Sequence, residues 1–206
     1  MADPRIAESA RPMDDEDRKL FRQLIQGGQP AFETLYARHQ GQIYRFALHM
    51  SGNPATAEEV TQEVFMVLID SPKGYDDAKG TVAAWLYGVA RNLTRRRISQ
   101  VRLDLPLIEE AIGNDDSGDS SFCSGSDPLA ELSQSEMLDL LRKAVLTLPE
   151  PYREAVVLCE LEEMSYPEAA SILECAPGTV ASRLHRAKAM LQTKLRARQR
   201  GVMCEK

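Results

Sequence analysis

Residues 165–191 read SYPEAASILECAPGTVASRLHRAKAML and contain the start and stop signals of two helices joined by a short turn. Ser165 and Glu168 have the spacing of a capping box, in which the serine hydroxyl accepts from the glutamate amide and the carboxylate reaches back. The first helix is expected to end near Leu173, and Pro177 suits the first turn of the next one. This pattern predicts a helix–turn–helix, a motif whose second helix can enter the major groove of DNA.

The helix that starts near Pro177 is expected to have an apolar face and a basic face. Val180, Leu184 and Ala187 recur at helical spacing and should point into a core. The opposite face offers hydroxyl, imidazole and guanidinium groups, which can contact base edges and phosphates. The candidate contacts to duplex DNA are Thr179, Ser182, Arg183, His185, Arg186 and Lys188. The alternative interpretation is an ordinary amphipathic helix with a solvated basic face.

The remainder of the chain also shows helical periodicity, and no strand pattern is convincing. In the C-terminal part, amphipathic stretches cover residues 137–148 and 151–163. In the N-terminal part, start and stop signals predict helices over residues 15–25, 30–50, 54–70 and from Thr81 through the arginines that follow. The predicted fold class is all-α, with two small helical domains.

A polar segment separates these two domains. Residues 115–128, DDSGDSSFCSGSDP, are rich in Ser, Gly and Asp and lack periodicity, which is typical of a flexible linker. Along the chain we expect an N-terminal tail over 1–14, a first domain over 15–103, an acidic linker over 104–135, a second domain over 136–200 and a tail over 201–206.

Charge is segregated along the sequence. Residues 104–136 hold nine acidic side chains and no Lys or Arg, whereas the net charge of the whole chain is only −6. By contrast, residues 91–102 contain five Arg and residues 183–200 contain seven Lys or Arg, and neither stretch contains an acid. Two separate basic stretches indicate contacts with nucleic acid, which the average charge conceals.

Several classes of function are not supported by the sequence. No apolar run approaches the ~20 residues of a membrane span, and the N-terminus lacks the apolar core of a secretory signal, so we expect a cytoplasmic protein without membrane insertion. The four cysteines (Cys123, Cys159, Cys175 and Cys204) form no CxxC pair, so neither a metal nor another cofactor is expected. No carboxylate pairs with a His or a nucleophile, and no phosphate-binding glycine-rich loop is present, so no catalysis is expected.

The C-terminal domain resembles a known family. The stretch LPEPYREAVVLCELEEMSYPEAASILECAPGTVASRLHRAKAML, residues 148–191, is similar to the fourth conserved region of extracytoplasmic-function (ECF) sigma factors, with GTVASRLHRAK as its most specific signature. The resemblance implies that the helix–turn–helix reads the promoter −35 element. Ala181 departs from the family pattern, which usually has Lys or Arg there, so one DNA contact is in question.

The stretch NPATAEEVTQEVFMVL, residues 53–68, resembles the family's second-region helix that docks on the clamp of the polymerase β′ subunit. Its acidic and amide side chains suit a basic partner surface, although a solvated helix face is the alternative. The implied polymerase contacts are Glu58, Glu59, Gln62, Glu63 and Phe65. The family usually has Asp at positions 56 and 59, where this chain has Thr56 and Glu59.

The stretch TVAAWLYGVARNLTRRR, residues 81–97, resembles the helix that melts the promoter and reads the −10 element, and the loop over residues 73–80 lies where the family holds a flipped base. Aromatic rings can stack on unpaired bases while arginines follow the phosphates. The implied contacts are Lys73, Tyr75, Tyr87, Arg91, Asn92, Arg95 and Arg96. Trp85 shares the spacing of Leu86 and Val89, so we expect it in the core.

The resemblance also implies partners. They are core RNA polymerase, through its β′ clamp and β subunit, promoter DNA that is duplex at −35 and single-stranded at −10, and an anti-sigma factor that releases the chain under stress. The acidic linker is either a solubilising spacer or, as in the family, a segment threaded through the polymerase. Two other hypotheses are a free-standing helix–turn–helix regulator, which leaves residues 58–63 and 91–97 without a role, and a small enzyme, which no motif supports.

Overall fold

The computed structural model describes residues 13–78, 80–104, 138 and 140–203, and these residues contain helices and turns without a strand. The helices in chain order are α1 (Met13–Ile25), α2 (Gln29–Ser51), α3 (Pro54–Asp70), the 3₁₀ turn η2 (Pro72–Gly74), α4 (Val82–Asp104), α6 (Glu150–Val156), the π turn η3 (Val157–Leu161), α7 (Tyr166–Leu173) and α8 (Pro177–Met203). Residues 140–146 are helical as well. The all-α prediction is therefore confirmed, while the predicted linker and both tails lie largely outside the described residues.

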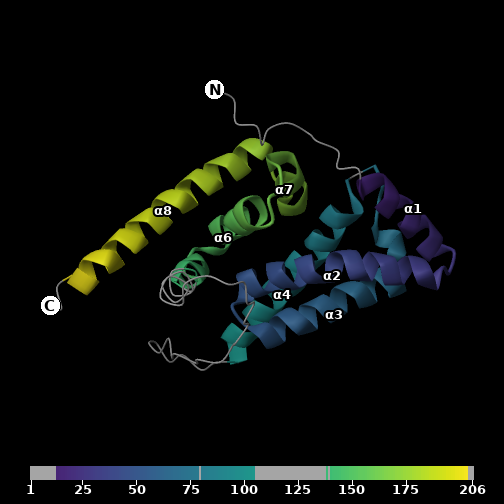
Figure 1. The fold of residues 1–206 in the computed structure, drawn as a ribbon, viewed down its shortest axis with the longest axis horizontal. Helices are drawn as coiled ribbons and strands as arrows, with labels where there is room; N and C mark the ends of the chain where they lie inside the picture. The colour runs from purple at the N-terminus through teal and green to yellow at the C-terminus, as the bar shows by residue number, and fades with distance from the viewer. Residues whose placement is uncertain (1–12, 79, 105–137, 139, 204–206) are drawn as a thin grey trace, which may run out of the picture.

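Helices α1–α4 form an N-terminal bundle in which α2 and α3 lie side by side (Figure 1). The reversal between them follows from two end signals in the sequence. Gly52 adopts the left-handed conformation with a φ of 71° and donates its amide to the Leu48 carbonyl, and the Asn53 side chain then accepts from the Thr56 amide. Leu35, Phe46 and Val60 are buried where these helices meet.

An ion-pair cluster holds α1 against α2. Asp17 is 2% exposed, and its carboxylate lies 2.8 Å from His39 Nε2 and 2.9 Å from Arg38 Nη1. Burial alone would raise the pKa of Asp17, but the hydrogen bonds and charges of His39 and Arg38 outweigh burial and lower it. The ionised carboxylate is therefore part of the folded bundle.

The second unit, which we call the C-terminal unit, consists of residues 140–196, whose side chains the structure describes. It contains the predicted helix–turn–helix. The capping box is present: the Glu168 amide donates to Ser165 Oγ at 3.4 Å, and the Ser165 amide donates to Glu168 Oε2 at 2.8 Å. The turn after α7 has Glu174 at a φ of 52°, a left-handed conformation that glycine adopts more easily.

The two units pack directly against each other. Helix α7 contacts α4, and η3 contacts α2. Figure 1 shows α6 and α7 between α8 and the bundle. The buried apolar residues of both units belong to one continuous cluster. No helix among the described residues is long and apolar enough to span a bilayer.

We expect Asp17→Asn to lower the free energy of unfolding by about 2 kcal/mol at neutral pH, because it removes a buried charge that pairs with Arg38 and is hydrogen-bonded to His39. The folded-state pKa of Asp17 is lowered, so its contribution is complete above the ordinary value of 3.8 and is lost as the pH falls through the folded value. Urea unfolding at neutral and acidic pH measures this difference, which should shrink in acid. Exposed Asp15→Asn is the control, and an equal loss for both variants would contradict the assignment.

We expect Glu174→Gly to raise the free energy of unfolding by about 0.5–1 kcal/mol. Glycine relieves the strain of the left-handed backbone at the turn, and the greater conformational entropy of glycine in the unfolded chain offsets part of this gain. Thermal and urea unfolding measure the change. Gln192→Gly, at an exposed position within α8, should instead destabilise by about 1 kcal/mol. A loss of stability in Glu174→Gly would show that the turn is not strained.

Candidate nucleic-acid interface and polymerase-binding face

Helix α8 separates its apolar and basic faces. Val180, Leu184 and Ala187 are at most 2% exposed and form its inner face, while Ser182, His185 and Arg186 are exposed on the opposite side. This arrangement leaves hydroxyl, imidazole and guanidinium groups available to a major groove.

The remaining predicted residues of α8 have neighbours within the C-terminal unit. Thr179 is half-buried at the start of the helix. Arg183 is also half-buried, with Nη1 4.0 Å from Cys175 Sγ, and exposed Lys188 lies 3.0 Å from the Glu160 carboxylate. All six predicted DNA contacts therefore lie on α8. Three of them, Ser182, His185 and Arg186, are exposed and form no salt bridge among the described residues.

The predicted polymerase contacts lie on α3, beside an open groove between α2 and α3. The groove has a volume of about 590 Å³, and Arg45, Glu58 and Gln62 are among the residues that line it. Glu58, Glu59 and Gln62 are exposed. The groove therefore mixes cationic, anionic and amide groups at the surface where a partner was expected.

Arg97 of α4 binds two of the predicted acidic contacts. Its Nη1 lies 3.1 Å from Glu59 Oε2, and its Nη2 pairs with the half-buried Glu63. The acidic face of α3 is thus partly neutralised within the bundle.

Phe65 lies in the core rather than on the polymerase-binding face. It is 3% exposed, and its ring centroid is 4.7 Å from that of Tyr36. Its expected direct contact with a partner therefore does not fit this conformation, because the ring packs inward between α2 and α3. Exposed apolar residues do occur on α3: Met66 is 57% exposed and Ile69 is 49% exposed. Their spacing from Gln62 places them on the same helix face, a signal that the sequence reading did not use.

The predicted −10 residues divide into a buried group and an exposed group. Tyr87 is 2% exposed and Arg91 is 9% exposed, whereas Asn92, Arg95 and Arg96 are exposed. Lys73 belongs to the η2 turn. The structure therefore places most of these residues on or beside α4 without leaving all of them open to a ligand.

The loop before α4 is held to α1 and is closed by a hydrogen bond between two of its own residues. The Tyr75 hydroxyl donates to the Gly80 carbonyl at 3.1 Å, and burial together with Asp77 raises its pKa to about 12. Asp77 pairs with Arg18 and Arg22 of α1. Trp85, expected in the core, is half-buried with its ring edge-on to Phe21.

A cavity of about 270 Å³ lies between this loop, α4 and α7. Tyr75, Trp85 and Asn92 line it from the bundle, and Ser171 and Glu174 line it from the C-terminal unit. The loop predicted to receive a flipped base thus borders a cavity, and part of its wall comes from the second unit.

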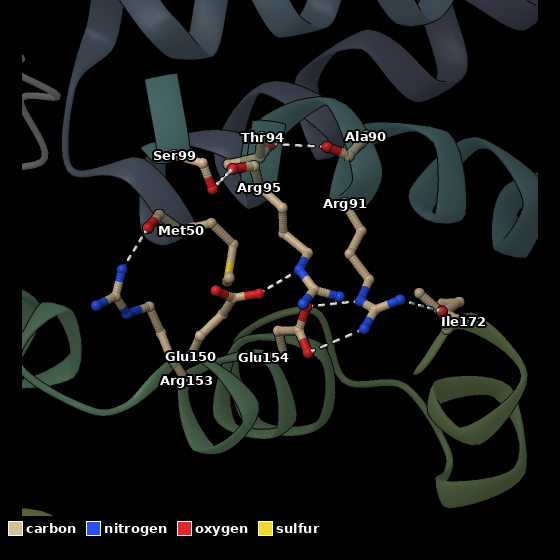
Figure 2. A network of polar contacts seen from close by, with 10 residues as sticks. All are labelled: Met50, Ala90, Arg91, Thr94, Arg95, Ser99, Glu150, Arg153, Glu154 and Ile172. Atoms are coloured by element: carbon tan, nitrogen blue, oxygen red, sulfur yellow. Dashed lines mark hydrogen bonds and ion pairs between the residues drawn. The ribbon is translucent and has the colours of Figure 1, made fainter. Parts of the chain in front are cut away.

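Three acids of the C-terminal unit, which the sequence reading did not select, bind the N-terminal bundle (Figure 2 shows two of them). Arg91 Nε donates to Glu154 Oε1 at 2.6 Å, Arg95 pairs with Glu150, and the Tyr87 hydroxyl donates to Glu162 Oε2 at 2.8 Å. Burial raises the pKa of Glu162, against the lowering effects of Tyr87 and of nearby Arg45. Periodicity alone assigns such glutamates to a solvated face, so no sequence signal identifies these partners.

No group of His, Cys, Asp and Glu that could hold a metal ion occurs among the residues with described positions. Cys159 is buried and Cys175 is half-buried, and neither forms a disulfide among the described residues.

Comparisons with known proteins agree with this architecture. The family model described as Sigma-70 region 2 matches residues 35–102, and Sigma-70, region 4, matches residues 138–191. The ECF RNA polymerase sigma factor SigW of Bacillus subtilis strain 168 is 32% identical over 184 residues, covering 87% of this chain and 96% of SigW. The ECF RNA polymerase sigma-E factor of Escherichia coli strain K12 is 30% identical over 188 residues, covering 87% and 94%.

Two solved structures are similar in fold. CnrH, in complex with the cytosolic domain of CnrY, superposes with a TM-score of 0.63 at 26% identity and covers 89% of this chain and 99% of CnrH. The sigma factor RpoE of Bartonella quintana, in complex with the anti-sigma factor NepR, superposes with a TM-score of 0.59 at 25% identity, covering 80% and 96%. With both regions matched in order and relatives covered over nearly their full length, this chain belongs to the extracytoplasmic-function RNA polymerase sigma factors, a family of non-enzymatic transcription initiation factors.

Proposed function

We propose that this chain binds core RNA polymerase and directs it to promoters by placing α8 in the major groove of the −35 element and α4 against unpaired bases of the −10 element. The observation that carries the proposal is the division of α8 into a buried apolar face and an exposed face with Ser182, His185 and Arg186. Arg can donate to guanine edges, and Ser can contact a base or a phosphate. Half-buried Ala181 cannot supply the phosphate or base contact of the usual basic residue.

At the −10 element, α4 and the preceding loop supply the groups that single-stranded DNA needs. Asn92 and Arg96 are exposed, and the cavity bordered by Tyr75 and Trp85 has an aromatic wall. Aromatic faces favour unstacked bases, and guanidinium groups hold the phosphates. DNA opening is driven by binding energy in this proposal, without nucleotide hydrolysis.

For polymerase, the groove between α2 and α3 and the outward face of α3 form the docking surface for the β′ clamp. Glu58, Glu59 and Gln62 provide hydrogen-bond acceptors and charge for a basic partner, and Met66 and Ile69 add exposed apolar area. The C-terminal unit contacts the β subunit. The acidic linker passes through the polymerase, where its negative charge suits a channel that otherwise binds nucleic acid.

Regulation by an anti-sigma factor is part of this proposal. The similar structures of CnrH and RpoE contain the cytosolic domain of CnrY and the anti-sigma factor NepR, respectively. We infer that this chain is likewise held by such a partner and released by a stress signal. A factor that acts on polymerase and promoter DNA works in the bacterial cytoplasm.

Run-off transcription with purified core polymerase and a promoter library tests the proposal. We expect promoter-specific transcripts that require the chain, and we expect Arg186→Ala to reduce transcription from −35-dependent templates about tenfold, the usual effect of losing one bidentate base contact. Lys143→Ala, an equal change in charge at an exposed residue outside α8, is the control. Failure to form a complex with core enzyme, combined with tight binding of the chain alone to duplex DNA, would instead support a free-standing regulator.

A further inference from the structure

We propose that α1 positions the loop that receives a −10 base, with Arg18 and Arg22 holding Asp77 and, through it, the ring of Tyr75. This inference rests on the proposed function, in which the cavity beside α4 takes an unstacked base of the promoter. Helix α1 precedes the residues that the Sigma-70 region 2 model matches, which are 35–102. The positioning element therefore lies outside that match.

Asp77 joins the loop to α1 through both of its carboxylate oxygens. Oδ1 lies 2.8 Å from Arg18 Nε, and Oδ2 accepts a hydrogen bond from Arg22 Nη2 at 3.0 Å. The two arginines are four residues apart in the helix and therefore lie on one face of α1. A carboxylate held at both oxygens has a fixed orientation, because turning it would break one of the two charged contacts.

The Tyr75 side chain is held at both its hydroxyl and its ring. The hydroxyl donates to Asp77 Oδ1 at 3.2 Å and to the Gly80 carbonyl at 3.1 Å. The ring centroid is 4.6 Å from that of Phe21 and 6.1 Å from that of Trp85, and the ring planes are inclined as aromatic pairs prefer. Phe21 belongs to α1 and is 2% exposed. Helix α1 thus contacts Tyr75 directly through Phe21 and indirectly through Asp77.

These contacts prepare one wall of the cavity before DNA binds. Tyr75 and Trp85 line the cavity of about 270 Å³, and rings that are already ordered lose little freedom when a base stacks on them. The two arginines also neutralise Asp77, whose negative charge would otherwise lie beside the phosphates of the bound strand. Both effects favour capture of a base at this one position.

The fold itself does not depend on this ion pairing. The side chain of Asp77 is 43% exposed and that of Arg22 is 69% exposed, and exposed ion pairs contribute little to the stability of a fold. Loss of the pairing should therefore change the loop while the bundle stays folded. The inference can for this reason be tested in the full chain.

Trp85 is the one tryptophan of the chain, so its fluorescence reports the order of the loop in the free protein. Asp77→Asn keeps the shape of the side chain and removes its charge. We expect this variant to shift the emission to longer wavelength and to increase quenching by acrylamide, because the loop no longer covers the half-buried indole. Asp15→Asn, the same change at an exposed residue of α1, should leave both unchanged. Unchanged quenching in Asp77→Asn would overturn the positioning role.

Binding of single-stranded DNA to the complex of the chain with core polymerase tests the consequence for −10 reading. The probe is a labelled strand from a promoter that the chain transcribes, in which each base is removed in turn to leave an abasic site. For the wild type, removal of the captured base should weaken binding about tenfold, within the usual range for one stacked base. Asp77→Asn, and Arg18→Gln combined with Arg22→Gln, should reduce this factor to about twofold. Lys19→Gln, at an exposed residue of the same helix, should retain it.

The possible outcomes separate this inference from the proposed function. A merely structural defect would weaken binding to every strand in the same proportion, so an unchanged tenfold factor in the variants would overturn the role of α1. Arg18→Lys combined with Arg22→Lys keeps both charges and should restore the factor to near the wild-type value. A wild-type complex for which no abasic site matters more than the others would overturn the proposed capture of a base, and this inference with it.

Discussion

The arrangement of the two units depends on the contact between Arg91 and Glu154. A guanidinium and a carboxylate that are both removed from water stabilise the packing only as a pair, so α4 and α6 must meet in one register. That register brings Arg95 to Glu150 and Tyr87 to Glu162. It also places Ser171 and Glu174 over the cavity beside Tyr75 and Trp85.

The two proposed DNA-reading helices differ in how much of their surface this packing covers. Helix α8 packs its apolar face within its own unit and leaves Ser182, His185 and Arg186 exposed. Helix α4 is covered along the face of Tyr87 and Arg91 but leaves Asn92 and Arg96 exposed. In this conformation the proposed −35 surface on α8 is open, and much of the proposed −10 surface on α4 is covered.

Local chemistry predicted the helices and their ends well. The Ser165–Glu168 capping box and the reversal at Gly52 and Asn53 depend on neighbouring residues, so the sequence contains nearly all the information that fixes them. Contacts between residues that are far apart in the sequence could not be predicted in this way. Helical spacing identifies which face a residue occupies, but it does not show that Glu154 covers Arg91, 63 positions away, or that Phe65 packs inward against Tyr36. The candidate residues therefore lie mainly on α3, α4 and α8, which the sequence predicted to be helical, whereas their accessibility depends on tertiary packing.

The distance between α4 and α8 in the free chain and in the polymerase complex tests this account most directly. Spin labels introduced by unnatural amino acids at exposed Gln100 and Gln192 would report it by double electron–electron resonance. The account predicts one short distance population for the free chain and a shift to longer distances when core polymerase binds. The same short distance in both states would contradict it, because the glutamates would then remain on α4 in the transcribing complex.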